Sequence, residues 1–248
     1  MSNFDLVLQR RNTRSLKWDM MERIYNIEDA SDILPMWVAD MDFKAPPKVL
    51  DAIQERIEQG VLGYSYVCEG CKQSIVSWFE TRHKWIIDSS TILFHHGVIP
   101  IIATVIETFT KPGDQVGMMT PVYPPFFNLP TNQKRQITQV TLYEEDGKYT
   151  IDYEMLEQTF KDGVKLFILC NPHNPGGIVW TKDDLQRIVD LAIQYNVLIL
   201  SDEIHADILM KGHAYTPLLT LPNASKAKII TAIAPTKTFN LAGIQAAM

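Results

Sequence analysis

The chain has 248 residues, of which 46% are hydrophobic and 21% are charged, and its formal net charge is −6. This composition excludes a disordered or collagen-like chain. The excess of acidic residues argues against a nucleic acid or an anionic membrane surface as the main partner. Three cysteines are too few for a disulfide framework, and the N-terminal residues lack the apolar core of a signal peptide. We therefore expect a cytoplasmic protein without a membrane-spanning segment.

The first part of the chain is predicted to form an arm followed by two helices. Residues 1–45 are irregular and contain several large apolar side chains, which indicates an arm that packs on other structure. Pro46 and Pro47 suit a helix start, and apolar residues then recur at three- and four-residue spacing until Gly60. A second amphipathic helix is predicted through Ile75 and as far as Trp85.

After Ser89 short β-rich runs alternate with helical stretches. The expected strands are 92–96, 115–119, 137–142, 164–170, 197–201 and 228–233, and the expected helices are 99–109, 124–132, 153–160 and 183–195. This alternation predicts an α/β fold with a mostly parallel sheet sandwiched by helices. We expect two parts, an N-terminal arm at 1–45 and a large α/β domain at 46–248.

Ligands of open α/β sheets bind at the carboxyl ends of the strands, so the residues that follow each expected strand are candidates for chemistry. Gly97, Val98 and Ile99 lead into a helix, whose free amides suit a phosphate, although such a turn is more often plain topology. Tyr123 can stack on a flat ring or be a buried tyrosine with a bonded hydroxyl. Asn174 can donate to a phenolate oxygen or bond its own backbone.

Two charged residues complete the set of strand-end candidates. Asp202 follows an apolar run and therefore needs a cation or hydrogen bonds, which a protonated ring nitrogen, an arginine or a helix cap could supply. Lys237 follows another apolar run; it is either a surface lysine or a desolvated amine that forms a Schiff base with an aldehyde. Together the five clusters meet the requirements of pyridoxal 5'-phosphate, and that combination favours the functional interpretation of each.

Several segments resemble a known family. NPHNPGG (171–177), SDEIHAD (201–207) and APTKTFNLAG (234–243) resemble signature segments of fold-type I pyridoxal-phosphate enzymes of the class I/II aminotransferase superfamily. The segments at 10–19, LPMWVADMDF (34–43), LGYSY (62–66) and TPVYPPF (120–126) resemble more narrowly the MalY/PatB subfamily of cystathionine β-lyases. Ala234 and Gln245 stand where many class I relatives carry a phosphate-binding Ser and Arg, which favours the same subfamily.

The resemblance implies a role for individual residues. Lys237 would be the Schiff-base lysine, Asp202 the partner of the pyridine nitrogen and Tyr123 the aromatic ring that stacks on the cofactor. The remaining implied contacts are those of Asn174 and His205 with the phenolic oxygen, of Val98, Ile99 and Thr236 with the phosphate, of Tyr64 with the phosphate of a neighbouring subunit, and of Val38 and Ala39 with the substrate. The contact of Tyr64 implies a homodimer.

The resemblance also implies a reaction. An enzyme of this subfamily cleaves cystathionine or related cysteine S-conjugates by β-elimination to a thiol, pyruvate and ammonia. An aminotransferase is the alternative, because both reactions begin with the same proton removal. A catalytically inactive truncated fragment with a binding or regulatory role is a third possibility, because the family continues into a C-terminal small domain with the arginine for the substrate carboxylate. The lone C-x-x-C at Cys68–Cys71 predicts no metal site.

Overall fold

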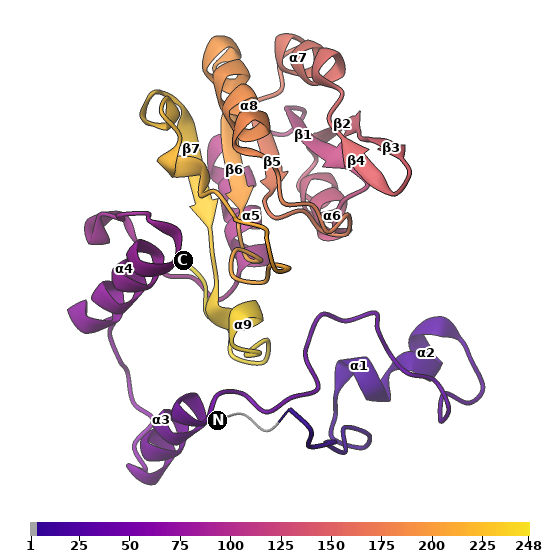
Figure 1. The fold of residues 1–248 in the computed structure, drawn as a ribbon, viewed down its shortest axis with the longest axis vertical. Helices are drawn as coiled ribbons and strands as arrows, with labels where there is room; N and C mark the ends of the chain where they lie inside the picture. The colour runs from indigo at the N-terminus through magenta and orange to yellow at the C-terminus, as the bar shows by residue number, and fades with distance from the viewer. Residues whose placement is uncertain (1–3) are drawn as a thin grey trace. The chain divides into compact units, whose positions relative to one another are not determined.

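A five-stranded parallel sheet lies at the centre of the larger of two compact units in the computed structural model, which describes residues 4–248. This larger unit comprises Val67–Ala234 and Gln245–Met248. The strands lie in the order β2 (Gln136–Thr141), β1 (Gln115–Thr120), β5 (Leu166–Cys170), β6 (Leu198–Asp202) and β7 (Lys228–Ala232) (Figure 1). All four neighbouring pairs are parallel, so the carboxyl ends of the five strands meet at one edge of the sheet.

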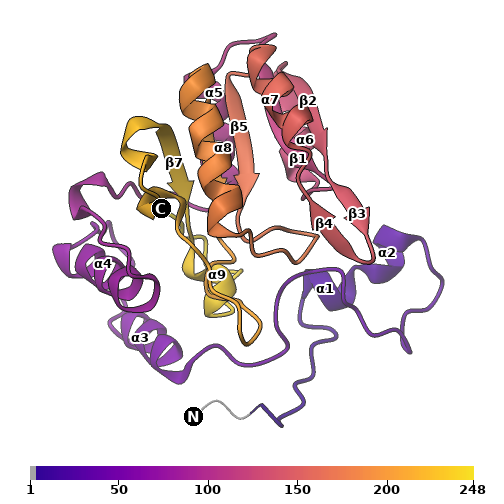
Figure 2. The same ribbon diagram turned by 45° about the horizontal axis from the view of Figure 1, so that its top comes forward.

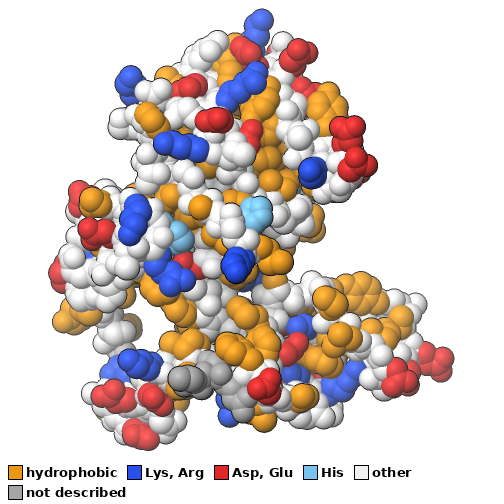
Figure 3. Space-filling model, in the orientation of Figure 1, with side chains coloured by type: hydrophobic (Ala, Val, Ile, Leu, Met, Phe, Trp, Pro, Cys, Tyr) orange, Lys and Arg blue, Asp and Glu red, His pale blue; other side chains and the backbone are white. Residues whose placement is uncertain are grey.

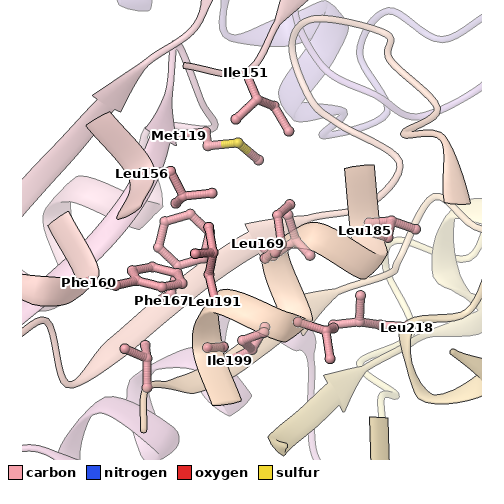
Figure 4. Close-up of a cluster of buried hydrophobic side chains, with 14 of the residues drawn as sticks. Met119, Ile151, Leu156, Phe160, Phe167, Leu169, Leu185, Leu191, Ile199 and Leu218 are labelled. Carbon is pink, nitrogen blue, oxygen red and sulfur yellow. The ribbon is translucent and has the colours of Figure 1, made fainter. Parts of the chain in front are cut away.

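Helices cover both faces of the sheet and enclose two apolar cores. One face carries α7 (Tyr153–Lys161) and α8 (Lys182–Tyr195), and the other carries α5 (Val98–Phe109) and α6 (Pro125–Asn132). Figure 2 shows α8 in front of the sheet and α5 behind it. In the first core, Leu156 and Phe160 of α7 lie beside Phe167 of β5, and Leu185 of α8 lies on the side of Leu169 (Figure 4). This two-sided burial explains why β5 is wholly apolar and why β6 begins with three apolar residues.

Local sequence signals define the helix ends. The side chain of Thr181 accepts a hydrogen bond from the Asp184 amide, and Asp184 accepts one from the Thr181 amide, so α8 begins with a capping box. Asp152 accepts a hydrogen bond from the Met155 amide at 2.9 Å and caps α7. Asn196 ends α8 in the left-handed region at φ 57°, where asparagine is tolerated better than most residues.

The remaining elements of the larger unit are short apart from one helix. They are α4 (Glu69–His83), the antiparallel pair β3 (Tyr143–Glu145) and β4 (Lys148–Thr150), and the 3₁₀ turns η1 (Ser89–Thr91), η2 (Leu218–Thr220) and η3 (Ala224–Lys226). Phe79 of α4 and Trp85 form a small third core with Ile233, which lies just beyond β7. The helix ends at His83 because Lys84 is left-handed at φ 56°.

The predicted strand at 92–96 is wrong. Only His95 has a β partner there, in an isolated antiparallel bridge with Ala247, and their two backbone hydrogen bonds are both 2.8 Å long. Met248 in turn exchanges backbone hydrogen bonds with Ile233, at 2.8 and 2.9 Å. A β-rich run becomes a strand only where a neighbouring strand supplies a ladder of hydrogen bonds, and here the neighbouring segment contributes a single bridge.

The smaller unit contains the chain up to Tyr66 together with Pro235–Ile244. Its helices are α1 (Leu16–Asp19), α2 (Met21–Tyr25), α3 (Pro47–Glu58) and α9 (Pro235–Thr238). Ion pairs hold the irregular part together. Arg10 lies 2.9 Å from Asp40 and 2.7 Å from Asp42, and the amine of the buried Lys17 lies 2.7 Å from Asp42. The predicted separation of an arm at 1–45 from a domain at 46–248 stays a prediction.

The sheet and its covering helices confirm the predicted α/β fold class. The other five expected strands and all the expected helices are present, with ends that differ by one or two residues in most cases. On the face drawn in Figure 3, the Lys and Arg side chains of the larger unit are interspersed with Asp and Glu side chains. No helix within residues 4–248 is long and apolar enough to cross a membrane.

Candidate active site

Three strands of the larger unit bring candidate side chains to the same edge of the sheet. Asp202 is the last residue of β6, while Tyr123 and Asn174 lie three and four residues beyond the ends of β1 and β5. The strands are adjacent and parallel, and the register pairs Cys170 with Asp202. The spacing of neighbouring strands, about 5 Å, therefore sets the scale of the cluster.

Asp202 is the most deeply buried of these candidates, with 5% of its surface exposed. Its Oδ1 accepts a hydrogen bond from the Ile204 amide at 3.2 Å, and its carbonyl accepts one from the Asn171 amide at 2.9 Å. A carboxylate removed from water in this way interacts strongly with nearby charge because little solvent screens it. Asp202 therefore places a buried carboxyl group at the carboxyl edge of the sheet.

Asp202 perturbs its neighbours in a way that shows their proximity. Burial raises the pKa of the Tyr123 phenol, and the carboxylate of Asp202 raises it further. Burial together with the same carboxylate also raises the pKa of the Cys170 thiol. Both groups therefore stay neutral at pH 7. Tyr123 is 38% exposed, so part of its ring is available to a ligand beside Asp202.

Hydrogen bonds between the NPHNP turn (171–175) and the residues around it hold Asn174 close to the end of β5. The Asn174 amide donates to the sulfur of Cys170 at 3.3 Å, and the Trp180 indole donates to the Cys170 carbonyl at 2.9 Å. The Asn171 side chain donates to the carbonyl of Thr216 at 3.1 Å. The backbone that presents the Asn174 side chain is thus fixed on both sides.

The N-terminus of α5 offers backbone donors. The helix begins at Val98, so the amides of Val98 and Ile99 have no acceptor within it. Pro100 follows and has no N–H, which leaves these two amides as the donors of the first turn. The positive end of the helix dipole favours an anion at this point.

The lysine candidate belongs to the smaller unit, where it contacts the predicted substrate segment. Lys237 lies in the four-residue helix α9, and its amine donates to the carbonyl of Ala39 at 2.9 Å. Val38, Ala39 and Thr236 belong to the same unit. Tyr64, also in this unit, has a fully exposed ring. His205 is half-buried in the larger unit, three residues beyond β6.

Sequence reasoning missed Asn240. Its side chain donates to the carbonyls of Met41 and Phe43 at 2.9 and 2.8 Å, and it accepts a hydrogen bond from the Met41 amide at 2.9 Å. These three hydrogen bonds join the lysine turn to the 39–43 segment. The only local signal in the sequence is an asparagine that shortly follows the Pro-Thr turn. Asparagine is one of the few residues that adopt a left-handed φ, and Asn240 has a φ of 54°.

Sequence reasoning also missed Glu203, which follows Asp202 directly and is 1% exposed. Its carboxylate accepts hydrogen bonds from the hydroxyls of Ser201 and Tyr215 and from the Leu218 amide. Burial outweighs these hydrogen bonds and raises the pKa of Glu203 to about 7. Within residues 4–248, no cluster of three or more His, Cys, Asp or Glu side chains is arranged to hold a metal ion.

The parallel sheet and its covering helices define an α/β protein with candidate ligand-binding side chains at the carboxyl edge of the sheet. Residues 31–248 match the model of the family "aminotransferase class I and II", and the chain belongs to this family. The chain is 42% identical to cystathionine beta-lyase PatB of Bacillus subtilis and 30% identical to the protein MalY of Escherichia coli. These alignments cover 98% and 100% of this chain and 62% of each relative.

A solved structure supports the same relationship. Cystalysin of Treponema denticola, whose crystal structure contains a pyridoxal 5'-phosphate cofactor, aligns with a TM-score of 0.94 and 40% identity. The alignment covers all of this chain and 63% of cystalysin. The chain thus spans less than two thirds of the length of these relatives. The predicted resemblance to the class I/II superfamily and the MalY/PatB group is confirmed.

Proposed function

We propose that this chain is the cofactor-binding part of a pyridoxal-phosphate C–S lyase that cleaves cystathionine or a related cysteine S-conjugate by β-elimination. The observation that carries the proposal is the buried carboxylate of Asp202, with the exposed ring of Tyr123 near it at the carboxyl edge of the sheet. The names of the relatives support the reaction, because PatB is a cystathionine beta-lyase and is 42% identical to this chain.

The residues at the edge of the sheet fit the chemistry of this cofactor. A buried carboxylate suits a protonated pyridine nitrogen, because the ion pair compensates for its lost hydration. The ring of Tyr123 offers a face for stacking, and the side chain of Asn174 can donate to a phenolate oxygen. The amides of Val98 and Ile99 suit the phosphate.

Chain connectivity supports the assignment of Lys237 to this site. Ala232 of β7 pairs with Asp202 of β6, and Lys237 follows Ala232 by only five residues. Five residues of extended chain span at most about 18 Å, so the lysine backbone cannot lie farther than this from the end of β7. The side chain adds further reach toward the strand ends. The short connection to β7 is therefore compatible with the proposed assignment of Lys237 to the site of Asp202.

The protein's own groups have distinct tasks in the proposed reaction. When bound, the cofactor supplies an aldehyde for amines and an electron sink for charge that develops at the substrate α-carbon. Asp202 would hold the proton on the ring nitrogen, and Tyr123 would cover the ring. The amine of Lys237 takes the α-proton as general base. The Cβ–S bond then breaks, the sulfur leaves as a thiolate, and water converts the remaining three-carbon fragment to pyruvate and ammonia.

The contacts of Lys237 support a base function next to the predicted substrate segment. The Ala39 carbonyl accepts a hydrogen bond from the lysine amine, and Asn240 ties the next residues of that segment to the lysine turn. Val38 and Ala39 would therefore lie against the substrate α-carbon, close to the base that removes its proton. This arrangement makes proton removal depend on the WVADMDF segment as well as on the lysine.

The experiment compares two reactions of the purified protein loaded with pyridoxal 5'-phosphate. Release of pyruvate and a thiol from cystathionine without a keto acid supports β-elimination. Amino transfer that requires a keto acid supports the aminotransferase alternative, which the family name keeps open. Lys237→Ala is the control and abolishes either reaction. If the cofactor binds but neither reaction occurs, the lyase proposal fails for this chain and a binding or regulatory role replaces it.

A homodimer in the cytoplasm completes the proposal. Tyr64 lies in an exposed apolar stretch with Val61, Leu62 and Tyr66, and α3 has no buried residue among its twelve. Apolar side chains gathered in this way are typical of an interface between subunits. Tyr64 would reach the phosphate bound to the partner subunit. Sedimentation equilibrium tests the dimer: a mass of two chains supports it, and a monomer at all concentrations contradicts it.

A further inference from the structure

A buried carboxylate closes the loop that follows β6. Glu203 begins this loop, and its Oε1 accepts hydrogen bonds from the Ser201 hydroxyl at 2.7 Å and from the Leu218 amide at 3.2 Å. Its Oε2 accepts the hydroxyl of Tyr215. Leu218 starts the turn η2, so the two ends of the segment 203–218, which we call the β6 loop, meet at one carboxylate.

The middle of the β6 loop is held by α4. Asp207 accepts hydrogen bonds from the Trp78 indole at 3.1 Å and interacts with the His83 ring at 2.7 Å. The ring of His83 also packs edge-on against the ring of Tyr215, with 5.0 Å between their centroids. The side chains of Asp207 and His83 are each only 8% exposed. The loop is thus anchored at its ends by Glu203 and at its centre by Asp207.

The β6 loop contains or adjoins two of the residues proposed to contact the cofactor. Asp202 immediately precedes Glu203, and His205 follows it by two residues. The Glu203 amide donates to the carbonyl of Ala232 at 2.9 Å, so its backbone is also tied to β7. The carboxylate of Glu203 is 1% exposed and, in the proposed reaction, touches neither substrate nor cofactor.

We propose that Glu203 is a positioning residue, which closes the β6 loop and thereby fixes the Asp202 carboxylate and the His205 ring for the cofactor. The effect on the cofactor rests on the proposed function, whereas closure of the loop does not. A glutamate at this position joins three donors from both ends of the loop. If the acceptors are removed, the amide of Leu218 and the hydroxyl of Tyr215 are left buried without a partner, and the loop opens to solvate them.

The test uses Glu203→Met, which keeps a similar length but has no strong acceptor, and Glu203→Gln, which retains a carbonyl acceptor. Glu157→Met is the matched control, because Glu157 accepts the hydroxyl of Tyr195 at 2.8 Å and joins α7 to α8 away from the β6 loop. Amide hydrogen exchange is measured without cofactor. Affinity for pyridoxal 5'-phosphate, and the pH midpoint of the visible absorbance of the bound cofactor, are then measured for each protein.

The expected result is local. In Glu203→Met the amides of the β6 loop exchange about ten- to a hundredfold faster, because the hydrogen bonds to a buried carboxyl group are lost. Cofactor affinity falls by a similar factor and the pH midpoint of the absorbance shifts. Glu203→Gln recovers most of each change, and Glu157→Met changes none of them. If Glu203→Met does not fold, Tyr215→Phe gives the same pattern at a smaller size, because it removes one donor only.

Two results would overturn the inference. Exchange in the β6 loop of Glu203→Met that equals exchange in Glu157→Met shows that Glu203 does not close the loop. Faster exchange with unchanged cofactor affinity and pH midpoint shows that Glu203 closes the β6 loop but does not position Asp202 and His205 for the cofactor. If the unaltered chain takes up no pyridoxal 5'-phosphate, the proposed function fails, and the exchange measurement still decides whether Glu203 closes the loop.

Discussion

The imidazole of His173 is held neutral by burial, and this makes a sharp prediction about pH and stability. The side chain is 3% exposed, and neither of its ring nitrogens has a hydrogen-bond partner among residues 4–248. Its ring packs at 5.6 Å from the ring of Trp180, and a Cβ on Gly176 would come within 2.9 Å of its Nδ1. Burial lowers the pKa of His173 from 6.5 to about 4.

The protonation of His173 determines how the stability of the fold changes with pH. In the unfolded chain His173 takes up a proton near pH 6.5, whereas in the folded chain it resists protonation until about pH 4. The unfolded state therefore binds more protons within this window, and stability falls as the pH is lowered through it. A pKa difference of about 2.5 units corresponds to about 3 kcal/mol, at 1.36 kcal/mol per unit.

The variant His173→Phe keeps a ring against Trp180 but cannot be protonated. We expect the unfolding free energy of the variant, measured by urea denaturation, to gain about 3 kcal/mol relative to the unaltered protein between pH 7 and pH 4. Glu203 titrates in the same range with the opposite sign, but it is common to both proteins and cancels in the difference. His213→Gln, at an exposed position, is the control. A difference between variant and parent that does not change with pH would refute the buried neutral imidazole.

Three further predictions concern the core, the cofactor contact and the lysine turn. Leu169→Ala removes a fully buried side chain from the first core and is expected to lower the unfolding free energy by about 2–5 kcal/mol in urea denaturation. Asp202→Asn removes the buried charge and is expected to weaken binding of pyridoxal 5'-phosphate, measured by equilibrium dialysis, by about tenfold or more. Asn240→Ala removes three hydrogen bonds and is expected to slow the labelling of Lys237 by pyridoxal 5'-phosphate, trapped with borohydride, by about tenfold. Asn223→Ala, which removes a hydrogen bond to Asp190, is the control and is expected to leave the labelling rate unchanged.

The sheet was predictable because its strands are buried on both faces and differ clearly from the amphipathic helices between them. The runs at 164–170 and 197–201 are apolar enough to be recognised without periodicity, and α8 carries both an apolar stripe and a capping box. The run at 92–96 has the same composition as a strand. It does not form a strand because a strand needs a neighbouring strand as hydrogen-bond partner, and the composition of a run does not show whether that partner exists.

The candidate site was predictable only in part. Asp202 directly follows the apolar run at 197–201, so topology places it at the carboxyl edge of the sheet. Its carboxylate raises the pKa of Cys170 at the end of the adjacent strand β5 and that of Tyr123 in the turn after β1. Asn240 and Glu203 were not predictable. Their partners, at 41–43 and at 215–218, are separated from them in sequence or lie in irregular segments where no periodic pattern applies.

The most direct test of the central claim is to identify the lysine that the cofactor labels. The protein is incubated with pyridoxal 5'-phosphate, reduced with borohydride, digested and analysed by mass spectrometry, with Lys237→Arg as the control. We predict one equivalent of phosphopyridoxyl group on Lys237 and none above background in the control. Labelling spread over several surface lysines, or equal labelling of Lys237→Arg, would contradict the assignment of this chain as the cofactor-binding part of a pyridoxal-phosphate enzyme.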